Sequence, residues 1–138
     1  MGQFRPRSIS EIAARAARGS QPFDPAVAEF LDEWQAMPDS ERRRAVASEP
    51  MRMDPTKDAY LAALAEHLSG TAGFDVPSWV EEPSRFLGEP FFAGGLESLK
   101  ATLLAESPPA FRRRLIFISA DALSRPDRNA ALHKALEV

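Results

Sequence analysis

Three residues suited to acid–base chemistry fall within one predicted helix. Asp58, Glu66 and His67 lie in the segment 55–70, and the last two are adjacent. Neighbouring helical residues point about 100° apart, and Asp58 would lie about 12 Å from Glu66 along the helix axis. That separation exceeds the spacing of paired catalytic carboxylates in glycosidases. We interpret these residues as polar positions beside an apolar stripe, and keep a small enzyme using Asp58, Glu66 and His67 as a second alternative function.

Other catalytic and metal-binding patterns are missing from the sequence. The two histidines, His67 and His133, belong to no HExxH or paired-histidine motif. Zero cysteines exclude disulfides, thiolate catalysis and cysteine-bound zinc. Gly94 and Gly95 are not followed by the lysine of a phosphate-binding loop. We therefore predict a protein that is not an enzyme and that holds no metal and no cofactor.

Arginine clusters are the remaining candidates for a binding site. Three arginines stand at 42–44 and three more at 112–114, and guanidinium groups bind phosphate, carboxylate and aromatic rings. The second cluster lies between apolar residues that would hold its backbone in place. We expect Ser107 to cap a short helix that starts with two prolines and points Phe111 inward. The predicted partner-binding residues are Phe111, Arg112, Arg113, Arg114 and Phe117.

A second basic region lies near the N-terminus. Four arginines stand there against one acidic residue, Glu11. Such a segment suits a solvated face or contact with something acidic. The alternative function is therefore a DNA-binding transcriptional regulator, and nucleic acid remains a partner in that interpretation. Its predicted nucleic-acid-binding residues are Arg5, Arg7, Arg15 and Arg18.

Helical periodicity organises the first half of the chain. Ser8 or Ser10 would cap a short helix that ends at Gly19, and Asp24–Pro25 would begin an amphipathic helix that contains Trp34. A short surface turn follows from Asp39 or Ser40. The strongest helix begins after Pro55 and ends at Ser69–Gly70. We expect the core of the protein to include Leu61, Leu64 and Leu68.

The second half is less regular. The segment 71–90 contains several prolines together with Phe74, Trp79 and Phe86, which predicts an ordered loop that wraps the domain. A helix through Leu96, Leu99, Leu103 and Leu104 would end before Ser107. At most one short extended segment is expected, near 115–118. The fold class is thus mainly α.

Composition limits the kind of protein. The 138 residues, 44% hydrophobic and 27% charged, predict a single compact domain over 1–138. The arm 1–7 and the tail 129–138 should be its least ordered parts. A net charge of −3 argues against a surface that is basic throughout. The absence of cysteine favours the cytoplasm, and no apolar run approaches the ~20 residues that cross a bilayer, so no membrane partner is expected.

A family resemblance rests on five segments: Ser8–Ala13, Phe30–Trp34, Ala59–Leu68, Val76–Val80 and Ser107–Ser124. Together they resemble a family of small uncharacterised bacterial proteins. Members of that family resemble the partner of a nucleotidyltransferase-fold protein encoded nearby, in a pair like a toxin and its antitoxin. The resemblance implies a helical, non-catalytic antitoxin or accessory partner and supplies no catalytic residue. The C-terminal segments also resemble those that follow a helix-turn-helix domain in some bacterial regulators. This chain lacks that motif, because Pro22, Pro25 and then an acidic helix follow its first helix.

Overall fold

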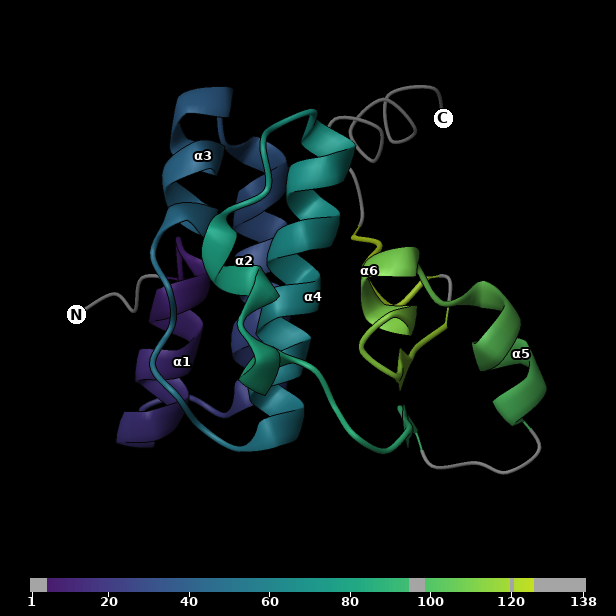
Figure 1. The fold of residues 1–138 in the computed structure, drawn as a ribbon. Coiled ribbons are helices and arrows are strands. Elements are labelled where there is room, and N and C mark those ends of the chain that lie inside the picture. Colours follow the sequence, from purple (N-terminus) through teal and green to yellow (C-terminus); the bar gives the residue numbers. More distant parts are fainter. Residues whose placement is uncertain (1–4, 95–98, 120, 126–138) are drawn as a thin grey trace, which may run out of the picture.

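Helices dominate the structure, a computed structural model that describes residues 5–94, 99–119 and 121–125. These residues form six α-helices, two short 3-10 helices and two strands of two residues each. The predicted mainly α fold is therefore confirmed. Figure 1 shows helices α1 to α4 side by side, with a smaller C-terminal lobe next to α4 on the side away from α1. That lobe contains β1, α5, α6 and β2.

Helix α1, Ile9–Arg18, has the predicted caps at both ends. The Ser8 hydroxyl accepts a hydrogen bond from the Glu11 N–H at 3.1 Å, which satisfies a backbone donor of the first turn. At the other end Gly19 adopts φ 74°, a left-handed conformation in which a side chain would be strained. The helix buries Ile9, Ile12 and Ala13.

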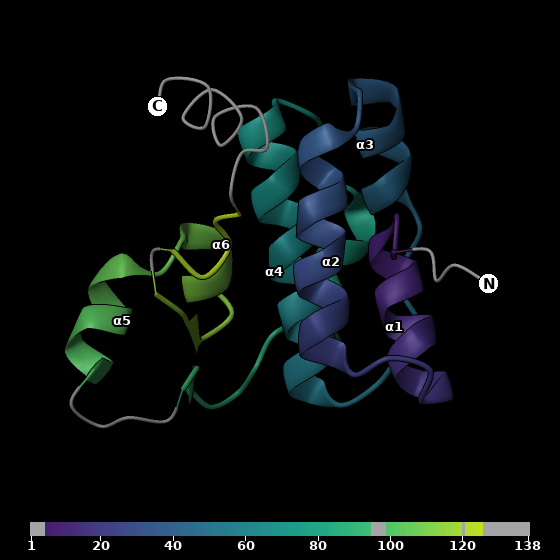
Figure 2. The ribbon, with the colours of Figure 1, turned by 180° about the vertical axis from the view of Figure 1, so that it is seen from behind.

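Helices α2, Phe23–Ala36, and α3, Asp39–Ala47, follow and run in opposite directions (Figure 2). The first begins one residue before the predicted Asp24–Pro25 start, and it buries Trp34 and Phe30 as its periodicity predicts. Met37 and Pro38 separate the two helices. The expected short turn is a complete helix, because Ala45 and Val46 bury against the rest of the bundle.

Helix α4, Pro55–Ala72, is the longest helix and the centre of the fold. Asp54 caps it by accepting from the Lys57 N–H at 2.9 Å. It continues past the predicted end at Ser69–Gly70, because the glycine that takes the left-handed capping conformation is Gly73, with φ 82°. The predicted core residues are confirmed: Leu61, Leu64 and Leu68 are all buried.

The segment after α4 is an ordered wrapping loop, as predicted. It contains the 3-10 helices η1, Ser78–Glu81, and η2, Pro83–Arg85. In Figure 1 this segment runs back along the bundle before it crosses to the C-terminal lobe. Its aromatic residues explain the order, since Phe74 and Trp79 are both buried.

The C-terminal lobe is built on one pair of parallel strands. Strand β1, Phe91–Phe92, pairs with β2, Ile116–Phe117, in the segment where one extended stretch was predicted. Helix α6, Pro109–Arg112, precedes β2. Between them Leu115 has φ 63°, a conformation that side-chain-bearing residues adopt at a cost, and the chain there turns from the helix into the strand.

Ser107 does not cap α6, contrary to the prediction. The residue at the capping position is Pro108, which makes no side-chain cap. The Ser107 hydroxyl instead accepts from the Ile118 N–H at 2.8 Å and donates to the Leu103 carbonyl. It therefore ties helix α5 to the end of β2, and the predicted inward position of Phe111 is confirmed.

Helix α5, Lys100–Glu106, is shorter than the predicted helix through Leu96, which lies outside the described residues together with Gly95. Only Leu103 of its leucines is buried, while Leu99 and Leu104 are exposed. The tail 129–138 and residues 1–4 of the arm also lie outside the described part. Within that part, no helix has the length and apolar character needed to cross a membrane.

Replacing Trp79 tests the packing of the wrapping loop. Its ring is 7% exposed and its indole N–H donates to the Val46 carbonyl at 3.0 Å. We expect Trp79→Ala to lower the free energy of unfolding by about 3–5 kcal/mol in urea denaturation, and Trp34→Ala to have a similar effect. Val76→Ala, in the same loop but exposed, should cost less than about 0.5 kcal/mol. A loss below about 1 kcal/mol for either tryptophan would contradict the core assignment.

Candidate functional site

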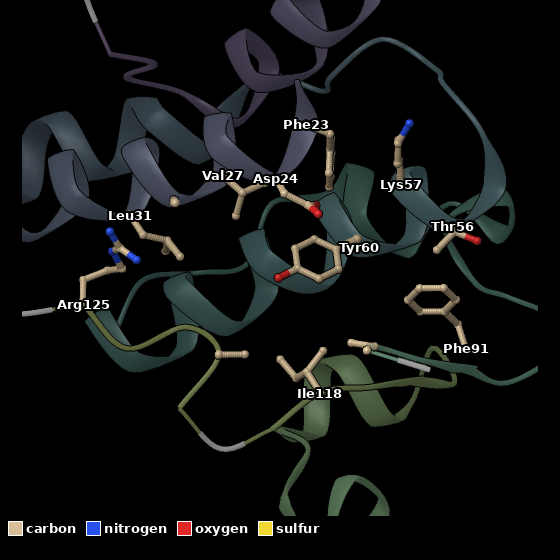
Figure 3. Close-up of a pocket in the computed structure, with 14 residues that line it drawn as sticks. Phe23, Asp24, Val27, Leu31, Thr56, Lys57, Tyr60, Phe91, Ile118 and Arg125 are labelled. Carbon is tan, nitrogen blue, oxygen red and sulfur yellow. The ribbon is translucent and has the colours of Figure 1, made fainter. Parts of the chain in front are cut away.

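A pocket lies where the C-terminal lobe meets the helical bundle. Its volume is about 540 Å³, within the range of small-molecule sites. Helices α2 and α4 form one side, and β1 with the chain after β2 forms the other (Figure 3). We call it the α2–α4 pocket. It is lined by Phe23, Asp24, Val27, Ala28, Leu31, Thr56, Lys57, Tyr60, Phe91, Ala93, Gly94, Ile118, Ala122 and Arg125.

Tyr60 is the central residue of the pocket. Its ring meets Phe23 of α2 edge-on at 5.9 Å between centroids, and Phe111 of α6 at 5.1 Å. Edge-to-face pairs of this kind are favourable beyond the area that they bury. The three rings therefore join α2, α4 and α6 and hold the floor of the pocket in place. Val27, Leu31 and Ile118 add apolar walls.

Two of the three charged side chains that line the pocket are already neutralised. Lys57 lies 3.3 Å from the Asp54 carboxylate, and Arg125 binds Asp32 through two hydrogen bonds of 2.8 and 3.2 Å. Asp24, by contrast, makes no hydrogen bond or ion pair within the described part of the chain. The pocket therefore presents one uncompensated carboxylate beside aromatic rings.

The environment of Tyr60 keeps its phenol protonated. Burial raises the pKa of Tyr60 to about 12, and the negative charge of Asp24 adds to the rise. Figure 3 shows the Asp24 carboxylate and the Tyr60 ring facing the same space. At neutral pH the phenol is thus a neutral hydrogen-bonding group.

A pH titration tests this environment, because Tyr60 is the single tyrosine of the chain. We expect its ultraviolet phenolate absorbance to rise with a midpoint near pH 12. In Asp24→Asn the midpoint should lie at a lower pH, because the negative charge that adds to the rise is removed. The folded-state pKa is above the unfolded value of about 10, so this contribution to stability is complete below pH 10. It is then lost as the pH rises toward 12, by about 2–3 kcal/mol in total. Far-UV circular dichroism at each pH controls for unfolding, and a midpoint near 10 in the folded protein would contradict the burial.

Arg114 is an internal residue, which corrects the expectation of three exposed arginines. Its side chain has 0% exposure. It donates to Glu66 at 2.7 Å and to the carbonyls of Ala110 and Val80 at 2.8 Å, and it stacks 4.5 Å above Phe86. Burial lowers the pKa of Arg114, while the bond to Glu66 favours the charged form. The residue fastens α6 to α4 and to the loop.

Arg113 and Arg112 remain at the surface. Arg113 binds Glu66 at 2.7 Å and Glu81 through two bonds of 2.9 Å, and the bond to Glu81 raises its pKa and lowers that of Glu81. Arg112 is exposed and donates to the Ser107 carbonyl at 2.7 Å. Of the predicted partner-binding arginines, Arg112 is the most available to a partner.

The two predicted aromatic anchors are core residues. Phe111 has no exposed area and packs on Tyr60 and on His67. Phe117 is also buried, and its ring stacks on Phe92 of β1 at 5.0 Å. They stabilise the C-terminal lobe from inside and cannot directly contact a partner without a rearrangement.

The structure does not bring Asp58, Glu66 and His67 to one site. The Asp58 carboxylate is buried, accepts from the Met53 N–H at 2.7 Å and lies 3.9 Å from Arg85. Glu66 binds Arg113 and Arg114 of the turn after α6, whereas the His67 ring lies against Phe111. Burial lowers the pKa of His67. Each residue of the predicted enzyme site thus has its own structural contact.

A double-mutant cycle measures the buried ion pair. Glu66→Ala should destabilise the protein by about 3–5 kcal/mol, because it leaves the buried charge of Arg114 without its carboxylate. The double variant with Arg114→Met should recover most of that loss, since a buried pair can often be replaced by apolar groups. Glu81→Ala, which removes an exposed partner of Arg113, should cost at most about 1 kcal/mol. Equal effects of Glu66→Ala and Glu81→Ala in urea denaturation would contradict this account.

Most arginines of the predicted nucleic-acid face are paired within the chain. Arg7 bonds to Glu33 at 3.1 Å and Glu41 at 2.8 Å. Arg5 lies 3.5 Å from Asp32, and Arg15 lies 3.5 Å from Glu11. Arg18 is exposed at the end of α1. These pairs lower the positive potential that phosphate binding requires, so DNA binding stays a prediction with little structural support.

The α2–α4 pocket was missed by sequence reasoning. Its lining comes from four separate segments, and Asp24 was interpreted as a helix cap. The single tyrosine in the middle of the strongest helix was the one available signal. Within the described residues, no group of three or more histidine, cysteine or acidic side chains could hold a metal ion.

Comparisons with protein-family models, with curated proteins and with solved structures find no match for this chain.

Proposed function

We propose that this protein is a non-catalytic interaction partner of the antitoxin-like type, which binds a nucleotidyltransferase-fold protein encoded nearby and acts in the cytoplasm. The observation that supports it best is the apolar surface of α5. A binding role also agrees with the separate structural contacts of Asp58, Glu66 and His67.

Helix α5 leaves most of its surface uncovered. Leu103 is its one buried residue, and Leu104 next to it is 47% exposed. Leu99, just before the helix, is also exposed. We call Ala101, Leu104 and Ala105, three exposed residues that helical spacing places on one side of α5, the α5 face. Apolar residues gathered on one element of the surface are typical of protein–protein contacts.

One cation lies beside the end of α5. Arg112 donates to the carbonyl of Ser107, the residue that follows α5. A guanidinium beside an apolar face fits a partner that carries acidic carboxylates, such as those that hold magnesium in nucleotidyl transfer. The proposed contact surface consists of Arg112 and the α5 face. The other predicted partner-binding residues Phe111, Arg114 and Phe117 are buried, and they support this surface from within the lobe.

Binding to the nucleotidyltransferase-fold protein encoded beside this gene tests the proposal. We expect the two proteins to purify together, and Leu104→Asp to weaken the affinity at least tenfold in calorimetric titration, about the loss of a moderate hot-spot residue. Arg112→Glu should weaken it as well. Met51→Asp is the matched control, because Met51 is 52% exposed on the connector before α4, away from the α5 face.

Two outcomes would contradict the proposal. One is the absence of any binding between the unaltered proteins. The other is binding that Leu104→Asp and Arg112→Glu leave unchanged, which would place the contact elsewhere. Thermal unfolding of each variant separates a lost contact from a lost fold, and we expect both substitutions to be tolerated because the side chains are exposed.

A further inference from the structure

We propose that the α2–α4 pocket is a binding site for a small organic cation, an ammonium group carried on an apolar body. This inference goes beyond the proposed partner binding and does not depend on it. The α5 face and the pocket are different surfaces, since no residue of α5 lines the pocket.

The charged residues that line the pocket favour a ligand of positive charge. Its two cationic side chains, Lys57 and Arg125, are held by Asp54 and Asp32, neither of which lines the pocket. Asp24 is the one lining charge that lacks an ion pair within the described residues. An ammonium group would compensate that carboxylate, whereas an anionic ligand would be repelled by it.

The aromatic side chains of the pocket also favour a ligand of positive charge. Rings attract cations placed over their faces within about 6 Å. The Lys57 ammonium lies 5.8 Å from the centre of the Phe23 ring, a contact of this kind within the chain. Tyr60 and Phe91 lie in the same pocket (Figure 3). The raised pKa of Tyr60 agrees, because the field of Asp24 opposes a second negative charge there.

The apolar walls and the volume of the pocket indicate what kind of group the ammonium would be attached to. Its walls are formed largely by Val27, Leu31, Ile118 and the three aromatic side chains. These would bury an apolar group, while the Tyr60 hydroxyl and the Asp24 carboxylate supply a few polar contacts. A volume of about 540 Å³ admits an aromatic ring with a short alkyl chain. An aryl-alkyl amine is therefore the chemistry that fits.

Three probes of similar shape and different charge test the site on the full chain. Calorimetric or nuclear magnetic resonance titration would compare phenethylammonium, neutral 2-phenylethanol and anionic 3-phenylpropionate. We expect phenethylammonium to bind about tenfold more tightly than 2-phenylethanol, and 3-phenylpropionate to bind most weakly. Asp24→Asn should remove most of the preference for the cation and leave 2-phenylethanol unchanged.

Matched variants identify the origin of the preference. Asp39→Asn removes a carboxylate from the first turn of another helix, α3, and does not line the pocket, so it should leave phenethylammonium binding unchanged. Ala28→Leu narrows the pocket, and it should lower the affinity for both phenethylammonium and 2-phenylethanol. Thermal unfolding of each variant verifies that the fold is retained.

Three results would overturn the proposal. These are equal affinity for the cation and the alcohol, undiminished cation binding by folded Asp24→Asn, and failure of all three probes to bind the unaltered protein at millimolar concentration.

Discussion

Two buried arginines, Arg85 and Arg114, contact helix α4 at different points along its length. They hold the second half of the chain against the first. Arg85 of η2 donates to the carbonyls of Asp58 and Pro50, at 3.3 and 2.7 Å, and its guanidinium lies 5.0 Å from the centre of the Trp79 ring. Arg114 donates to the Glu66 carboxylate, eight residues after Asp58 along α4, and to the carbonyls of Ala110 and Val80. A buried guanidinium is stable only when carboxylates and carbonyls surround it, so each of these arginines requires one arrangement of its neighbours.

That requirement explains how the wrapping loop and the C-terminal lobe find their places. Both arginines stack on an aromatic residue of the loop, Trp79 for Arg85 and Phe86 for Arg114. The loop therefore lies between the helix and the lobe as part of the packing (Figures 1 and 2). With the lobe held in this way, Phe111 reaches Tyr60, and Ile118 closes the α2–α4 pocket against α2. The α2–α4 pocket therefore depends on the ion pairs that hold the lobe in place.

The parts of the fold that could be predicted are those decided by local interactions. Ser8 and Gly19 bound α1 because capping depends on the backbone within one turn, and Leu61 with Leu64 lies in the core because helical spacing places both on one face. The end of α4 was predicted three residues early, since Gly70 and Gly73 offer the same local signal. Ser107 failed as a cap because a partner eleven residues away, Ile118, uses its hydroxyl. The candidate site was harder to predict, because Asp24 and Arg125 are 101 residues apart and neither has a local signature of ligand binding.

The sequence by itself determined a mainly α protein with an ordered aromatic loop, because periodicity, caps and buried tryptophans act over short distances. It also located an arginine block beside apolar residues. Only the tertiary structure decided which of those arginines face inward. Arg114 and Arg112 are two residues apart and chemically identical, yet one is enclosed by Glu66, Val80 and Ala110 while the other remains at the surface. The difference arises from which carboxylates and carbonyls the folded chain brings near each guanidinium, and those contacts span up to 48 residues along the sequence.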